Sequence, residues 1–182
     1  MGKMRDMETK RIFSILLSTM LLLSVAFAGG QKYLKRQLNW RLDHDLWAMN
    51  KWIDTTDKMN SKKKEATDSL KWCLEYRDKW LKRVLGNKAP KYNPNNLRAT
   101  AKTQHQAWKK YIRRGKLRKT ISYKTTSGKL KKKRTGYILH SSLAFGIYVR
   151  GGLRKIALND GLKRSEIPDT QSSKYFKHRK SS

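Results

Sequence analysis

The feature that most constrains this chain is a stretch of 81 residues between Asp78 and Asp160 that contains no acidic residue. The bases of this stretch therefore have no carboxylate within the stretch itself. It belongs to a chain of 182 residues with 44 Lys+Arg, 13 Asp+Glu and a formal net charge of +31. Because charges of one sign repel each other in a compact fold, we expect an external anion to compensate this part of the chain.

The charge is distributed unevenly along the sequence. Residues 29–86 carry 14 bases and 8 acids, whereas residues 87–182 carry 26 bases and 3 acids. This difference predicts a mixed-charge region (residues 29–86), a strongly basic region (residues 87–162) and a polar, basic tail (residues 163–182) that we expect to be disordered. The chain also has 6 Trp, 8 Tyr and 4 Phe, which are enough to build a hydrophobic core.

The first 28 residues indicate export. Residues 1–11 are basic, residues 12–28 are uncharged and almost wholly apolar, and the apolar run ends in Ala-Phe-Ala at residues 26–28. This order predicts a secretory signal peptide over residues 1–28. The alternative is an uncleaved membrane anchor, because 17 helical residues extend ~26 Å, just short of a hydrocarbon core of ~30 Å. In both cases the rest of the chain is exported, as a periplasmic or secreted protein or one anchored by residues 12–28.

Two amphipathic helices are predicted in the mixed-charge region, because apolar residues recur there at steps of three and four. They are Leu34, Leu38, Leu42, Leu46, Met49 and Ile53 in the first run, and Ala66, Leu70, Cys73, Leu74, Leu81, Val84 and Leu85 in the second. The polar residues 55–64 between the runs include no Gly or Pro. Two arrangements therefore remain: an αα-hairpin, or one long helix that forms a homo-oligomer with another copy. Gly86 is expected to end the second run as a glycine cap.

A third helix is predicted over residues 97–114. Asn95 is the expected N-cap, and Gly115 stands where a glycine commonly follows a helix end. The apolar spacing breaks after this glycine, so the helix is not expected to continue.

The basic region is then expected to form β-structure. Residues 117–125 and 129–140 predict a hairpin around a three-residue turn that ends in Gly128. Residues 143–149 predict a third strand, with a buried helix as the alternative, and residues 153–158 predict one or two helical turns. The expected fold class is α+β and mainly helical: a signal or anchor helix, two N-terminal helices, a third helix, a small basic β-hairpin or three-strand element, and a disordered tail.

The clearest functional feature is a cluster of bases interleaved with aromatic residues. Residues 108–119 carry seven bases in twelve positions, and residues 129–134 carry five in six. Cationic grooves with aromatic platforms are typical of single-strand nucleic-acid binders, and anionic lipids attract such segments by charge alone. The predicted polyanion-binding residues are Lys109, Lys110, Arg113, Arg114, Lys116, Arg118, Lys119, Lys129, Lys131, Lys132, Lys133 and Arg134, with Trp108 and Tyr111 as aromatic contacts.

Catalytic motifs are few. The acid-free stretch removes the paired carboxylates of a glycosidase, and a single cysteine provides no zinc-site spacing. We predict no metal site and no cofactor. The sequence Asp43-His44-Asp45 is expected on a solvated helix face, and Cys73 is expected to be buried and inert. A pair such as His105 and His140 could serve general acid–base hydrolysis of RNA if the fold brought them together.

Three functions follow from these features. The leading prediction is an exported, non-enzymatic cationic protein that binds anionic polymers or lipids at the cell envelope. The first alternative is a nucleic-acid-binding protein, virion-associated or secreted, that uses the same bases on phosphates. The second alternative is a small secreted or periplasmic hydrolase such as a ribonuclease.

Overall fold

The computed structural model describes residues 32–171 of the chain, apart from the side chains of residues 144, 145 and 147. The chain divides into two units, residues 1–37 and residues 38–182. Of the first unit only residues 32–37 are described, and they are helical. The predicted signal or anchor segment, residues 1–28, lies outside the described residues. Among the helices that are described, none has the length and apolar character needed to span a membrane.

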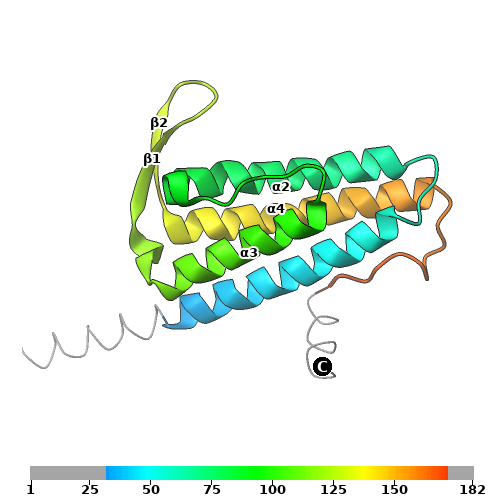
Figure 1. The fold of residues 1–182 in the computed structure, drawn as a ribbon, viewed down its shortest axis with the longest axis horizontal. Coiled ribbons are helices and arrows are strands. Elements are labelled where there is room, and N and C mark those ends of the chain that lie inside the picture. Colours follow the sequence, from blue (N-terminus) through cyan, green and yellow to red (C-terminus); the bar gives the residue numbers. More distant parts are fainter. Residues whose placement is uncertain (1–31, 172–182) are drawn as a thin grey trace, which may run out of the picture. The chain divides into compact units, whose positions relative to one another are not determined.

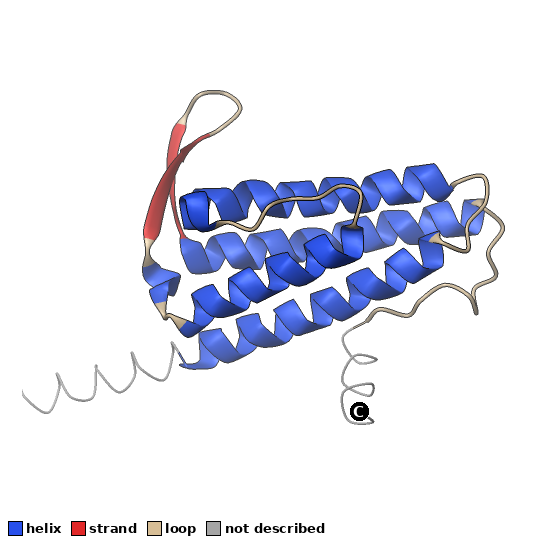
Figure 2. Cartoon of the chain, viewed as in Figure 1, coloured by secondary structure: helices blue, strands red, loops and turns tan. Residues whose placement is uncertain are grey.

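Four helices make up most of the second unit, and one β-hairpin joins the last two of them (Figures 1 and 2). The first helix runs to residue 56, and its residues 38–56 belong to this unit. The elements that follow are α2 (Lys63–Leu85), the short 3₁₀ helix η1 (Gly86–Lys88), α3 (Leu97–Arg113), the 3₁₀ helix η2 (Lys116–Arg118), β1 (Thr120–Lys124), β2 (Leu130–Arg134) and α4 (Thr135–Asn159). The prediction of a mainly helical fold with a small antiparallel hairpin is confirmed.

The first helix and α2 form an αα-hairpin, and a carboxylate from another element fixes its turn. Asp160, just after α4, accepts hydrogen bonds from the backbone N–H groups of Asn60 and Lys62, each at 2.7 Å. It also accepts one from the Ser61 hydroxyl at 2.7 Å. These hydrogen bonds lower the pKa of the Asp160 carboxyl, and the one from Ser61 has the largest effect. Of the two predicted arrangements, the αα-hairpin is therefore the one observed.

The ends of α2 and α3 follow local sequence rules. Gly86 follows α2 and Gly115 follows α3 by two residues, with positive φ angles of 59° and 72° that favour glycine. The predicted N-cap of α3 is wrong by one residue. Asn96 rather than Asn95 is the cap, because its side chain accepts a hydrogen bond from the N–H of Ala99 at 2.9 Å.

The third strand predicted over residues 143–149 is wrong, and its alternative, a buried helix, is the one observed. Residues 153–158 are helical as predicted, and both segments belong to α4. The predicted second strand of the hairpin also ends early, at Arg134, where α4 begins. Buried positions recur along α4 at steps of four and three, as a helix packed on one face requires; they are Leu139, Leu143, Gly146, Leu153 and Ala157. Burial of this face offsets the cost of about 1 kcal/mol for each glycine in a helix interior.

Two clusters of buried residues hold the bundle together, and both draw on all four helices. The cluster nearer the β-hairpin includes Leu38, Leu42, Leu81, Trp108, Ile112, Ile138 and Leu139. The other includes Met49, Trp52, Leu70, Cys73, Leu74, Ala101 and Leu153. The mixed-charge region and the basic region therefore share one core. The prediction that Cys73 is buried is confirmed, and this burial raises the pKa of its thiol.

Candidate functional site

The register of the β-hairpin separates its two faces. Ile121 and Tyr123 point toward the bundle, where Ile121 packs on the core and Tyr123 meets the ring of Trp80 edge-on at 5.1 Å. Because side chains alternate along a strand, the next residues in register lie on the opposite face. That outer face carries Thr120, Ser122, Lys124, Leu130, Lys132 and Arg134, all of them exposed.

An arginine on α2 helps to hold the hairpin in place. The guanidinium carbon of Arg83 lies 4.8 Å from the ring centre of Trp80 and 5.3 Å from that of Tyr123. Cation–π contacts at exposed sites contribute about 0.5–1 kcal/mol each. The hairpin is therefore attached to α2 through aromatic and cationic groups as well as through its covalent links to α3 and α4.

The predicted basic residues gather at one end of the bundle, because α3 runs through η2 directly into the hairpin (Figure 1). Backbone and side-chain bonds tie this junction to α4: Thr135 donates its N–H to the carbonyl of Lys119 at 2.9 Å and its hydroxyl to that of Lys116 at 2.8 Å. We call this region the basic end. Its exposed members are Lys110, Arg113, Arg114, Lys116, Arg118, Lys119, Lys124, Lys129, Lys131, Lys132 and Arg134.

Two of the predicted binding residues are engaged inside the protein instead. Lys133 is half-buried and donates a hydrogen bond to the hydroxyl of Ser141 at 3.0 Å. Lys109 forms an ion pair with Asp43 at 2.8 Å. Ten of the twelve predicted bases are thus exposed, whereas Lys109 and Lys133 help to stabilise the fold.

The predicted aromatic contacts are wrong. Trp108 is 2% exposed and Tyr111 is 5% exposed, and the two rings pack edge to face in the core. The hydroxyl of Tyr111 donates to the carbonyl of Lys116 at 2.7 Å. The large apolar side chains that are exposed near the hairpin are Leu130 on its outer face and Tyr137 in the first turn of α4.

The two histidines considered for catalysis have separate surroundings. His105 on α3 bonds through its Nε2 to Asp43 at 2.8 Å. Burial raises the pKa of the Asp43 carboxyl, but its bonds to His105 and Lys109 lower it by more. On α4, burial and then the positive charges of Arg41 and Lys133 lower the pKa of His140.

The prediction that Asp43, His44 and Asp45 lie on a solvated helix face is also wrong, since His44 and Asp45 are buried. The three side chains engage three different parts of the protein. Asp43 binds groups on α3, the Nε2 of His44 lies 3.0 Å from the carbonyl oxygen of Thr170, and Asp45 forms an ion pair with Arg77 on α2 at 2.6 Å. These contacts place a polar layer inside the bundle.

The Asp45–Arg77 pair depends on a glycine in α4. A Cβ atom at Gly146 would lie 2.7 Å from Oδ1 of Asp45 and 2.8 Å from Nη2 of Arg77. Burial lowers the pKa of Arg77, but the carboxylate of Asp45 prevails and raises it. The guanidinium of Arg77 therefore stays charged inside the core, next to its counter-ion.

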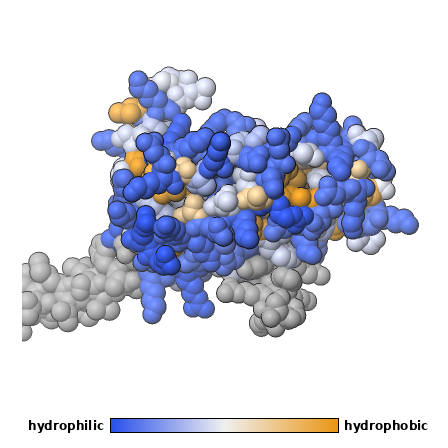
Figure 3. Space-filling model, viewed as in Figure 1, coloured by the Kyte–Doolittle hydropathy of each residue, from blue (hydrophilic) through white to orange (hydrophobic). Residues whose placement is uncertain are grey.

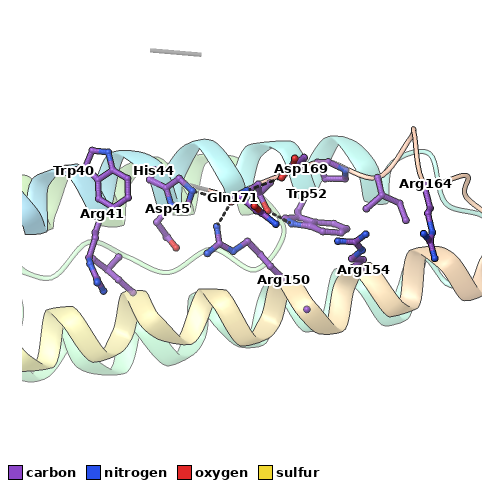
Figure 4. Close-up of a pocket in the computed structure, with 15 residues that line it drawn as sticks. Trp40, Arg41, His44, Asp45, Trp52, Arg150, Arg154, Arg164, Asp169 and Gln171 are labelled. Carbon is purple, nitrogen blue, oxygen red and sulfur yellow. Dashed lines mark hydrogen bonds between the residues drawn. The ribbon is translucent and has the colours of Figure 1, made fainter. Parts of the chain in front are cut away.

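A cavity of about 810 Å³ lies beside this polar layer, between the first helix, α4 and the segment that follows α4 (Figure 4). We call it the arginine cleft. Its lining residues are Trp40, Arg41, His44, Asp45, Trp52, Leu143, Arg150, Gly151, Arg154, Arg164, Ile167, Pro168, Asp169, Thr170 and Gln171. The lining thus includes four arginines and two acidic residues.

The segment after α4 forms the third wall of the cleft, and Thr170 holds it in place. The carbonyl oxygen of Thr170 accepts a hydrogen bond from Nη1 of Arg150 at 3.0 Å, and its Oγ1 accepts one from Nε1 of Trp52 at 3.4 Å. Because a carbonyl can only accept, the contact with His44 places a proton on its Nε2. Burial, followed by the charge of Arg150, lowers the pKa of His44. Residues 163–171 were expected in a disordered tail, but they pack on the bundle; residues 172–182 lie outside the described residues.

Sequence reasoning missed the arginine cleft, and only Arg150 offered a sign of it. That residue interrupts an apolar run between Val149 and Gly151, where a charged side chain needs a partner. Arg41 and Arg164 lie 123 positions apart in the chain, so no local pattern relates them. Comparisons of the chain with protein-family models, with curated proteins and with solved structures found no match.

Proposed function

We propose that this protein is an exported, non-enzymatic cationic protein that binds anionic lipids or polymers of the cell envelope through its basic end. The export part of the proposal rests on the sequence of residues 1–28. The binding part rests on one observation: the hairpin register leaves Lys124, Lys132 and Arg134 on an exposed outer face, next to the exposed bases of η2 and the last turn of α3.

Charge supports this function because the basic end has few internal counter-ions. No acidic residue occurs in the sequence between Asp78 and Asp160, so neither α3 nor the hairpin supplies a carboxylate. Each Lys or Arg near an anionic membrane contributes about 1 kcal/mol of attraction. A bound polyanion would therefore both gain this attraction and relieve the repulsion among the bases.

The apolar side chains at the basic end favour a lipid surface over nucleic acid. Leu130 is 65% exposed on the outer face of the hairpin, and Tyr137 is 64% exposed close by in sequence, in the first turn of α4. An apolar or amphipathic side chain among bases suits the boundary between headgroups and acyl chains. Base stacking on Trp108 or Tyr111, by contrast, would require opening the core.

The test is binding of the full chain to vesicles, with a charge-matched control. The hairpin variant is Lys124→Ser, Lys132→Ser, Arg134→Ser, and the control is Lys51→Ser, Lys58→Ser, Lys64→Ser, three exposed lysines near the turn between the first helix and α2, at the other end of the bundle (Figure 1). Both variants lose three positive charges. We expect the hairpin variant to bind vesicles with one-quarter phosphatidylglycerol on the order of 100-fold more weakly, since about 3 kcal/mol is lost.

The control variant should stay within a few-fold of the unmodified protein. Equal weakening of the two variants would show that net charge, rather than the basic end, drives binding. Equal binding of the unmodified chain to neutral and anionic vesicles at physiological salt would reject the proposed function. Figure 3 shows why the comparison is needed: hydrophilic residues cover most of the visible face, well beyond the hairpin.

A further inference from the structure

The charges of the arginine cleft are not balanced within it. Among the described residues that line it, Arg41, Arg150, Arg154 and Arg164 outnumber Asp45 and Asp169 by two positive charges. Asp45 is already paired with Arg77, whose side chain lies outside the cleft, so the effective excess is larger. Arginine stays protonated at any physiological pH, so this excess cannot be removed by titration.

The cleft also has the size and walls of a ligand site. Its volume of about 810 Å³ is within the range of roughly 300–1,000 Å³ that is usual for small-molecule pockets. Guanidinium groups come from the first helix, from α4 and from the segment after it, and Figure 4 shows them spaced along the cavity from Arg41 to Arg164. On the first helix, Trp40 adds an aromatic surface next to them, stacked on His44 with the two ring centres 5.5 Å apart.

Hydrogen bonds to one wall distinguish the cleft from a solvated charged surface. Its third wall is held through Thr170 by three side chains: His44, Trp52 and Arg150. Arg150 uses Nη1 for this bond, and a guanidinium has five N–H donors in a fixed plane. The positions of its remaining donors are thereby set before any ligand arrives, which lowers the entropy cost of binding.

We propose that the arginine cleft binds a small organic phosphate, with the phosphate among the arginines and the organic part against Trp40. A phosphate monoester carries a charge of −1.5 to −2 near pH 7 and three strong acceptor oxygens, which matches the excess charge and the planar donors of the cleft. The volume exceeds what inorganic phosphate alone would fill. A soluble nucleoside or sugar phosphate and the headgroup of a phospholipid share this chemistry.

The inference is tested with two matched double variants of the full chain. The cleft variant is Arg154→Gln, Arg164→Gln, two exposed arginines that line the cavity. The control is Lys155→Gln, Lys163→Gln, two exposed neighbours that do not line it and lose the same charge. Among the residues that the structure describes, none of these four side chains makes a hydrogen bond or ion pair, so both variants are expected to stay folded.

The measurement is calorimetric titration at physiological salt with adenosine monophosphate, glycerol 3-phosphate and inorganic phosphate. We expect at least one organic phosphate to bind with one-to-one stoichiometry and more tightly than inorganic phosphate. Binding should weaken on the order of 100-fold in the cleft variant, from about tenfold for each lost charge-assisted hydrogen bond, and change less than twofold in the control. Tighter binding of adenosine monophosphate would identify a soluble, flat ligand, and tighter binding of glycerol 3-phosphate a lipid headgroup.

Three results would overturn the inference. They are the absence of saturable binding by both organic phosphates, equal losses in the cleft and control variants, and binding of malonate as tight as that of the phosphates. The lysine and arginine substitutions on the hairpin serve as a further control. They should leave the affinity of the cleft for organic phosphates unchanged. Loss of lipid binding at the basic end and loss of phosphate binding in the cleft can therefore be told apart.

Discussion

The basic end and the arginine cleft both present cationic side chains to solvent, but the structures that carry these side chains differ. At the basic end the bases stand on a two-stranded hairpin and on helix ends, with long exposed side chains. In the cleft the arginines stand around a cavity whose walls join a buried ion pair and a chain segment held at Thr170. The first arrangement suits an extended, adaptable anion, and the second suits a ligand of defined size.

This difference shows that charge count alone is a poor guide to a binding site. The basic end carries eleven exposed bases. Long side chains of this kind lose rotamer freedom on binding, at a cost of up to ~2 kcal/mol each. The cleft has four arginines, of which Arg150 is already held by a hydrogen bond. Fewer charges in a preformed cavity can therefore be more selective than many charges on an open surface.

Loss of the ion pair behind the cleft is expected to destabilise the protein most. In the Asp45→Ala variant, the guanidinium of Arg77, only 6% exposed, would lose its counter-ion. Within residues 32–171, its Nε and Nη2 already have no hydrogen-bond partner. We expect the free energy of unfolding to fall by about 3–5 kcal/mol, measured by urea denaturation. The control is Asp54→Ala, which removes an exposed ion pair with Arg98 of the same 2.6 Å length and should cost less than about 1 kcal/mol. Equal losses would mean that burial does not distinguish the two pairs.

A smaller effect tests whether the glycine in α4 makes room for that pair. Gly146→Ala would push a methyl group against Asp45 and Arg77, and we expect it to lower the free energy of unfolding by about 1–3 kcal/mol. Gly151 lies on the same helix with nothing within 4 Å of an added Cβ, so Gly151→Ala should instead stabilise the protein by up to about 1 kcal/mol. Thermal unfolding of both variants gives the sign. Stabilisation by both substitutions would show that Asp45 and Arg77 can move to accommodate the methyl group at residue 146.

The smallest expected effect concerns pH and the wall held by Thr170. Burial, followed by the charge of Arg150, lowers the pKa of His44 in the folded protein, so the unfolded chain binds this proton more readily. The contribution of His44 to stability is therefore present above about pH 6.5 and is lost as the pH falls below it. His140 acts in the same direction. We expect His44→Gln, which keeps a donor for the carbonyl of Thr170, to lose less stability between pH 7 and pH 5 than the unmodified chain. Parallel pH curves for the two proteins would contradict this role.

Several parts of the fold could be predicted because they depend on neighbours in the chain. The apolar spacing of the first two runs, the glycines after α2 and α3, and the turn at Gly128, whose φ is 78°, each reflect preferences within a few residues. The clustering of the basic end was also predictable, since its bases are close in sequence. Residues 143–149 were mistaken for a strand because a short apolar run has the same composition in a buried helix.

The candidate sites were less predictable, because exposure is decided by contacts between distant residues. Trp108 and Tyr111 alternate with bases in the sequence, yet they face the core. Asp43, His44 and Asp45 are polar, yet each meets a partner from a different element. A pattern of residue types does not state which side of a helix will be covered by the rest of the chain.

The positions of most helices, the ends of α2 and α3 and the strong basicity of one stretch follow from the sequence alone, since backbone preferences and apolar spacing act over a few residues. The fixed turn of the αα-hairpin at Asp160, the burial of the predicted aromatic contacts and the presence of four arginines along one cavity depend on the packing of the whole bundle. These outcomes need groups far apart in the sequence to meet, and such meetings follow from burial of the helix faces rather than from any local pattern.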